Sequence, residues 1–146
     1  MCNNKEVVCI AISNNPILYD WQRLCYEKLI QQVIELVQKE AEVIFSDPSN
    51  IFVSSENRKN VGRLSEYNGP LDLVICTPSS LELDCAAKGL LVASLDLNVL
   101  HMHSPCVAKL STFEQFNEFL ELFKKPKSRI YLANIQKNNW LCVIEK

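Results

Sequence analysis

The order in which short apolar runs and longer amphipathic segments alternate along the chain constrains its fold most. The short runs are nearly continuous in Val, Ile, Leu and Cys, which is typical of strands buried on both faces of a parallel sheet. Segments with apolar residues at three- and four-residue spacing follow several of them, as helices do. This alternation predicts an α/β domain with a mostly parallel sheet and flanking helices.

The length and composition suit a single domain over residues 1–146. Apolar residues make up 48% of the chain and charged residues 22%, which argues against disorder. The formal net charge is −2, so tight nucleic-acid binding driven by charge alone is disfavoured.

The runs predict about six strands and three main helices. The predicted strands are Val7–Ile12, Glu42–Phe45, Leu71–Cys76, Leu97–Met102, Arg129–Asn134 and Trp140–Ile144. The predicted helices cover Trp21–Lys39, Ser80–Lys88, which Gly89 should end, and a third near Thr112–Lys124. Between Asp47 and Gly69 we expect a polar loop, with a short helical turn at Val61–Tyr67.

The seven cysteines indicate a reducing compartment rather than a disulfide framework. Their number is odd, no Cys-x-x-Cys occurs, and several lie within apolar runs, so we interpret them as reduced thiols of the core. His101 and His103 have no cysteine pair near them, so we expect no metal site. The longest apolar run, Val7–Ile12, is too short for a membrane span or a signal sequence, and we expect a cytoplasmic protein.

The sequence lacks the common catalytic motifs. With only Gly62, Gly69 and Gly89 in the chain, neither G-x-x-x-x-G-K-[ST] nor G-x-G-x-x-G occurs, and the nucleophile elbow G-x-S-x-G is also absent. We therefore expect neither nucleotide binding of the P-loop kind nor acyl-transfer catalysis, and no cofactor.

One segment has a pattern that suits ligand binding. The predicted strand Leu71–Cys76 ends in Thr77-Pro78 and turns at once into the helix predicted from Ser80. Ligands of open α/β sheets bind at the carboxyl ends of the strands. Free N–H groups at the helix start, with the Ser79 and Ser80 hydroxyls beside them, could hold a phosphate; a simple capped helix explains the same residues equally well.

The segment Thr77-Pro78-Ser79-Ser80-Leu81 resembles the T-P-G-R-L motif in the first RecA-like domain of the DEAD-box RNA helicases. At the spacing of the D-E-A-D motif this chain has the residues His101, Met102, His103 and Ser104. Upstream, Ser13, Asn14 and Asn15 follow a strand at the place of the family's P-T-R-E-L motif. Downstream, Arg129–Asn134 lies where the family has the strand that ends in S-A-T.

The resemblance implies a three-layer RecA-like domain that lacks the P-loop segment and both acids of the D-E-A-D motif. Such a domain would not hydrolyse ATP. It would serve as a scaffold for weak RNA binding, for protein partners, or for both, as in the Yb-like tudor-domain proteins of the piRNA pathway. The implied RNA-binding residues are Ser13, Asn14, Asn15, Thr77, Pro78, Ser79 and Ser80.

An alternative resemblance is to the nucleotide-sugar-binding half of GT-B glycosyltransferases. The stretch from Ser79 to Val92 keeps the spacing of S-[ST]-x-x-x-E-A-x-x-x-G-x-P-V, with Asp84 in place of the Glu that grips the ribose and Leu91 in place of the Pro. A third hypothesis is a RecA- or Rossmann-like fold used only for protein contacts. Single-stranded RNA and uridine nucleotides are the ligands that separate these hypotheses.

Overall fold

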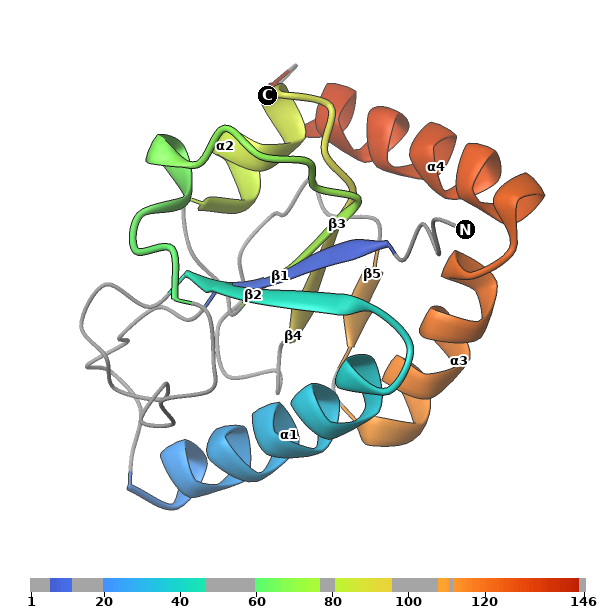
Figure 1. Cartoon of the computed structure of the whole chain (residues 1–146). Coiled ribbons are helices and arrows are strands. Elements are labelled where there is room, and N and C mark those ends of the chain that lie inside the picture. Colours follow the sequence, from blue (N-terminus) through green and yellow to red (C-terminus); the bar gives the residue numbers. More distant parts are fainter. Residues whose placement is uncertain are drawn as a thin grey trace, which may run out of the picture.

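The computed structural model describes residues 6–11, 20–46, 60–76, 81–95, 108–110 and 112–144, and every structural statement below concerns these residues. They form a parallel sheet with helices on both faces and one long helix along a side of the sheet (Figure 1). The predicted α/β class with a parallel sheet and flanking helices is confirmed.

Five parallel strands make up the sheet in the described part of the chain. They are β1 (Val7–Ala11), β2 (Glu42–Ser46), β3 (Leu73–Cys76), β4 (Val92–Leu95) and β5 (Ala108–Leu110). Their order across the sheet is β2-β1-β3-β4-β5. The first three lie where the sequence predicts strands. The prediction of about six strands differs from the five described: two of the predicted strands are helical, one lies outside the described residues, and β4 and β5 were not predicted.

The helices alternate between the two faces of the sheet. Helix α1 (Asp20–Gln38) connects β1 to β2 and packs, with α3 (Phe113–Phe123), on the face that carries Val8, Ile10 and Ile75. Helix α2 (Leu81–Ala87) connects β3 to β4 and packs on the opposite face, together with a short 3₁₀ turn at Leu64–Glu66. The helix that connects two parallel strands crosses over in a right-handed sense. The chain moves from β1 to β2 in one direction across the sheet and from β3 to β4 in the other, so α1 and α2 lie on opposite faces. The result is a doubly wound, Rossmann-like arrangement.

Helices α1 and α3 form because their apolar residues recur at helical spacing. On α1 the buried side chains are those of Leu29, Ile30, Val33, Ile34 and Val37. On α3 they are those of Phe116, Phe119, Leu120 and Phe123, and the Thr112 hydroxyl caps the helix by accepting a bond from the Gln115 N–H at 3.2 Å. Both predicted helices are confirmed within one or two residues, and the Phe stripe of α3 belongs to the core.

Gly89 ends α2 as predicted. Its φ of +80° lies in the left-handed region that favours glycine, and the Leu90 N–H donates to the Cys85 carbonyl at 3.1 Å across the turn. Leu90 is thereby turned back toward the start of β4.

The predictions of strands at Arg129–Asn134 and Trp140–Ile144 are wrong. Both segments lie within one helix, α4 (Pro126–Ile144). Pro126 is its first residue, where the fixed φ of proline suits a helix and its missing N–H has no cost. Leu132 and Gln136, four residues apart, are both buried on the inner face of this helix. The downstream part of the helicase resemblance, which needs a strand at Arg129–Asn134, therefore fails.

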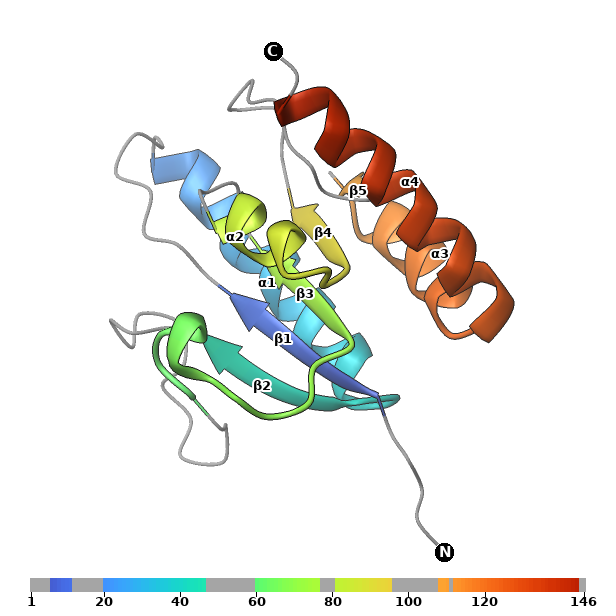
Figure 2. The same cartoon turned by 90° about the horizontal axis from the view of Figure 1, so that it is seen from above.

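Helix α4 closes the side of the sheet beyond β4 and β5, and it reaches from α3 toward α2 (Figures 1 and 2). The Gln136 side chain joins it to the sheet. Its Oε1 accepts a hydrogen bond from the Val92 N–H at 2.7 Å, and its Nε2 donates to the Leu90 carbonyl. Pairing of β5 with β4 begins only at Ala93, so the Gln136 amide takes the place of a missing strand residue.

An arginine fixes the start of α4. Arg129 forms an ion pair with Glu6 just before β1, donates from Nε to the Phe123 carbonyl at the end of α3, and lies 4.4 Å over the Phe123 ring. Its guanidinium holds the pKa of the Glu6 carboxyl below the usual range. A single side chain thus joins β1, α3 and α4.

Candidate functional site

The strand order places a candidate ligand site where β1 and β3 end. These strands are neighbours, and Ala11 is the register partner of Cys76. After β1 the chain leads to α1 on one face, and after β3 it leads to α2 on the other. A crevice forms at such a switch point in open α/β sheets, and ligands bind there. We call the end of the sheet formed by Ala11, Ser46, Cys76 and Leu95 the carboxyl rim.

The residues that the sequence predicts to bind RNA follow this rim directly, but they lie outside the described residues. Ser13, Asn14 and Asn15 come after Ala11, and Thr77, Pro78, Ser79 and Ser80 come after Cys76. His101, Met102, His103 and Ser104, together with the predicted strand Leu97–Met102, fall between β4 and β5 and are also outside them. The described structure fixes where three of these segments leave the sheet, at the neighbouring ends of β1, β3 and β4.

Small side chains form the floor of the carboxyl rim on the α2 face. The strand registers align Ser46, Ala11, Cys76 and Ser94 in one row across β2, β1, β3 and β4, and all four are buried. The Ser46 hydroxyl donates to the Gly62 carbonyl at 2.7 Å. Residue Ser94 is 1% exposed, and its hydroxyl has no hydrogen-bond partner among the residues that the structure describes.

Sequence reasoning missed Ser94. Buried polar atoms are normally hydrogen-bonded, so an unpartnered hydroxyl at the end of a central strand marks a position where a polar group is tolerated at some cost. The only sequence signal is a serine inside the apolar run Leu91–Leu95. The position of Ser94 in this run does not by itself show whether the serine is buried or on the surface.

The basic stretch Lys124–Arg129 lies at the opposite end of the sheet, the amino rim. Lys124 Nζ is 2.8 Å from Glu40 Oε1, just before β2, and 2.8 Å from Glu121 Oε1. Arg129 pairs with Glu6, just before β1. Two of the basic side chains thus form ion pairs within the fold, and the stretch is remote from the carboxyl rim.

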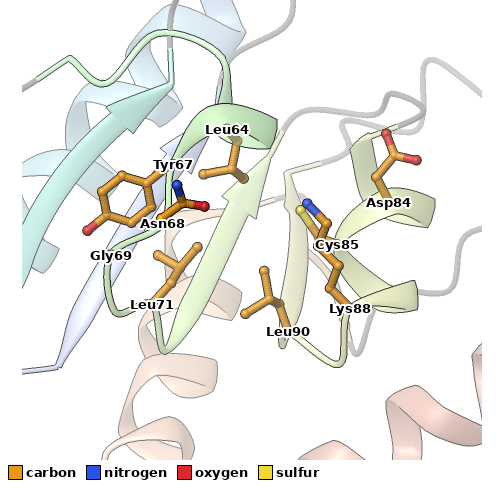
Figure 3. A pocket seen from close by; sticks show the side chains of 9 residues that line it. All are labelled: Leu64, Tyr67, Asn68, Gly69, Leu71, Asp84, Cys85, Lys88 and Leu90. Carbon is orange, nitrogen blue, oxygen red and sulfur yellow. The ribbon is translucent and has the colours of Figure 1, made fainter.

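A groove of about 220 Å³ lies between α2 and the segment that leads into β3 (Figure 3). Leu71 and Leu90, at the starts of β3 and β4, line it together with Tyr67, and Asp84 and Lys88 stand on α2 at its rim. Cofactor-sized pockets measure roughly 300–1,000 Å³, so this groove has room for one large side chain only. Asp84, the ribose ligand of the glycosyltransferase hypothesis, lines this groove.

Gly69 keeps one wall of the groove in place. A Cβ atom on Gly69 would lie 2.3 Å from the Tyr67 hydroxyl oxygen, which donates to the Pro70 carbonyl at 3.3 Å. A side chain at position 69 would therefore displace the Tyr67 ring from this wall of the groove.

Three buried cysteines lie on the α2 face of the sheet, as the prediction of core thiols requires. They are Cys9, Cys76 and Cys85, whereas Cys25 on α1 is exposed; none of these four described cysteines forms a disulfide. Burial among apolar side chains raises the pKa of Cys9 to about 12 and that of Cys85 to about 11. Both thiols stay protonated at neutral pH, so neither is a nucleophile.

The raised pKa of Cys9 predicts a loss of stability in alkali. Its ordinary value is 9.0, so between pH 9 and 12 the unfolded chain releases this proton while the folded chain retains it, and unfolding is favoured as the pH rises. By pH 10.5 this one thiol should cost about 2 kcal/mol. Urea unfolding at pH 8 and pH 10.5 measures the loss.

The Cys9→Ala variant is the test of that cause. It should start less stable than the parent at pH 8 but lose about 2 kcal/mol less between the two pH values. Cys25→Ala, at the exposed thiol, should show the full parental loss. Equal alkaline losses in all three proteins would show that the buried thiol is not responsible.

The described residues offer neither a metal centre nor a membrane span. No three His, Cys, Asp or Glu side chains among them are grouped so that they could hold a metal ion. No helix in the described part of the chain has the length and apolar character needed to cross a bilayer.

Comparisons of the chain with protein-family models, with curated proteins and with solved structures found no match.

Proposed function

We propose that this chain is a non-catalytic scaffold domain that binds single-stranded RNA at the carboxyl rim. The observation that carries the proposal is the parallel pairing of β1 with β3, in which Ala11 and Cys76 are partners. In the sequence, two segments rich in Ser, Asn and Thr follow these neighbouring strand ends, Ser13–Asn15 after β1 and Thr77–Ser80 after β3. Hydroxyls, amides and backbone N–H groups are the uncharged donors that contact nucleic-acid phosphates.

The proposal keeps the helicase relationship only for the chain up to Ser104. The motif Thr77-Pro78-Ser79-Ser80-Leu81 supports that relationship, and a sequence without the P-loop or the D-E-A-D acids fits a domain that does not hydrolyse ATP. A role in small-RNA biogenesis, as in the Yb-like proteins, is part of the same proposal.

Charge sets the expected strength of binding. The net charge is −2, and Lys124 and Arg129 form ion pairs within the fold. Few phosphates can then be neutralised, so RNA binding should be weak, with a shallow dependence on salt. ATP should have no effect.

The test is fluorescence anisotropy with a labelled single-stranded RNA of roughly twenty nucleotides at two salt concentrations. Replacing both hydroxyls, in Thr77→Ala with Ser80→Ala, should raise Kd about tenfold, since each lost hydrogen bond is worth about 0.5–1.5 kcal/mol. The control pair Lys125→Ala with Lys127→Ala, near the amino rim, should change Kd less than twofold.

Two outcomes would overturn the proposal. Loss of RNA binding in the lysine control, with the hydroxyl variant unaffected, would move the RNA to the amino rim. Stabilisation of the protein by uridine nucleotides, lost in Asp84→Ala, would favour the glycosyltransferase hypothesis instead.

A further inference from the structure

Helices α3 and α4 carry opposite charges, although they follow each other in the chain. Helix α3 has the acidic residues Glu114, Glu118 and Glu121 and no basic residue. Helix α4 has Lys127, Arg129 and Lys137 and no acidic residue. The three glutamates are four and three residues apart, so they lie on one exposed face of α3.

The outer face of α4 combines basic and apolar side chains. Opposite the buried Leu132 and Gln136, spacings of three and four residues form an exposed stripe: Lys127, Ile130, Asn134, Lys137 and Leu141. Ile130 is 69% exposed and Leu141 39%, and Tyr131 beside them is 66% exposed. We call this stripe, with Tyr131, the α4 face.

Four charged side chains on these two helices are not neutralised by an ion pair within the described part of the fold. Lys124 pairs with Glu40 and Glu121, and Arg129 pairs with Glu6. Lys127, Lys137, Glu114 and Glu118 form no ion pair with any residue that the structure describes. Leu122, one turn after Glu118 and 46% exposed, supplies an apolar side chain beside these glutamates. We call Glu114, Glu118, Glu121 and Leu122 the α3 face.

Charge complementarity identifies the occupant of the α4 face. Two α4 faces in contact would set lysines against lysines, and two α3 faces would set glutamates against glutamates, and both arrangements are repulsive. Contact between the α4 face of one molecule and the α3 face of another joins opposite charges and covers Ile130 and Leu122.

We infer that a second copy of this chain docks its α3 face on the α4 face, so that copies associate head to tail. Such a contact is heterologous and leaves one free face at each end, which permits chains longer than a dimer. Helix α4 has 19 residues and is about 28 Å long, so the contact lies at the small end of protein interfaces. Association should be weak and favoured by low salt.

Sedimentation velocity from about 10 to about 500 µM protein measures this association. At about 50 mM salt the average mass should rise above the monomer's 16.7 kDa with concentration, and about 500 mM salt should reverse the rise. The double variants Glu114→Lys with Glu118→Lys, and Lys127→Glu with Lys137→Glu, should each remain monomeric. An equimolar mixture of the two should associate again, because every contact between unlike molecules then joins opposite charges.

A control that leaves the net charge unchanged reverses two charges on α1, in Glu35→Lys with Lys28→Glu, and should associate as the parent does. Circular dichroism checks that all variants fold. A parent chain that stays monomeric at the highest concentration and low salt would overturn the inference. Association that survives either charge reversal, or a mixture that stays monomeric, would overturn it too.

Discussion

Replacing Gln136 with Met should lower the free energy of unfolding by about 2–4 kcal/mol, because it leaves two backbone groups without partners. Methionine has nearly the same shape but can neither accept from the Val92 N–H nor donate to the Leu90 carbonyl. The Val92 bond is buried, so water does not replace it. Urea unfolding at pH 7 measures the loss.

Two further variants test whether the loss of stability comes from the missing hydrogen bonds or from the methionine side chain itself. Asn138→Met places the same side chain at an exposed position of α4 and should change stability by less than about 0.5 kcal/mol. Gln136→Glu keeps an acceptor for the Val92 N–H, and when protonated it also regains a donor for Leu90. Its deficit relative to the parent should therefore shrink as the pH falls from 7 toward 5. A Met variant as stable as the parent would show that Gln136 does not hold α4 to the sheet.

The part of the fold that could be predicted is the part with long or purely apolar patterns. The runs around Val7–Ala11 and Leu73–Cys76 are buried on both faces and contain only apolar residues, and this pattern predicts strands. Helix α1 repeats its buried apolar face at helical spacing from Leu29 to Val37. Gly89 ends α2 through its left-handed backbone conformation, and Thr112 caps the start of α3 through its hydroxyl; both residue types favour these positions.

The remaining elements could not be predicted because their signals are short or mixed. β4 has four residues, two of them Ala93 and Ser94, and β5 has three, so each is too short for its composition alone to predict a strand. Helix α4 shows apolar residues on its outer face as well as its inner one, which hides its period. The residue that joins its inner face to the sheet is Gln136, a polar residue whose role depends on where β5 begins.

The candidate site likewise has a part that could be predicted from the sequence and a part that could not. Cys76 could be predicted as the end of a strand that borders a candidate ligand site, from the pattern of a buried strand that turns at once into a helix, whereas the strand end at Ala11 entered only through the helicase resemblance. That they pair with each other depends on the strand order, which no local pattern contains. Ser94 was missed because its burial is set by α2 and the sheet together.

Lys137→Pro should cost about 3 kcal/mol or more, and this variant distinguishes a helix from two strands over residues 129–144. The Lys137 side chain is exposed, so its loss removes no core contact. In a helix, proline lacks the N–H that bonds four residues back, and its ring clashes with that carbonyl. Had Arg129–Asn134 and Trp140–Ile144 been strands, residue 137 would lie in the loop between them, where proline costs little.

The control for this variant is Lys137→Ala, which keeps the backbone N–H and should change stability by less than about 0.5 kcal/mol. Thermal unfolding followed at 222 nm reports both the stability and the helix content. A proline variant that melts with the alanine control and keeps its helical signal would contradict the single helix α4. The loss is expected to exceed that of Gln136→Met only modestly, because both changes detach the same side of the sheet: one breaks the helix, and the other breaks its bonds to β4.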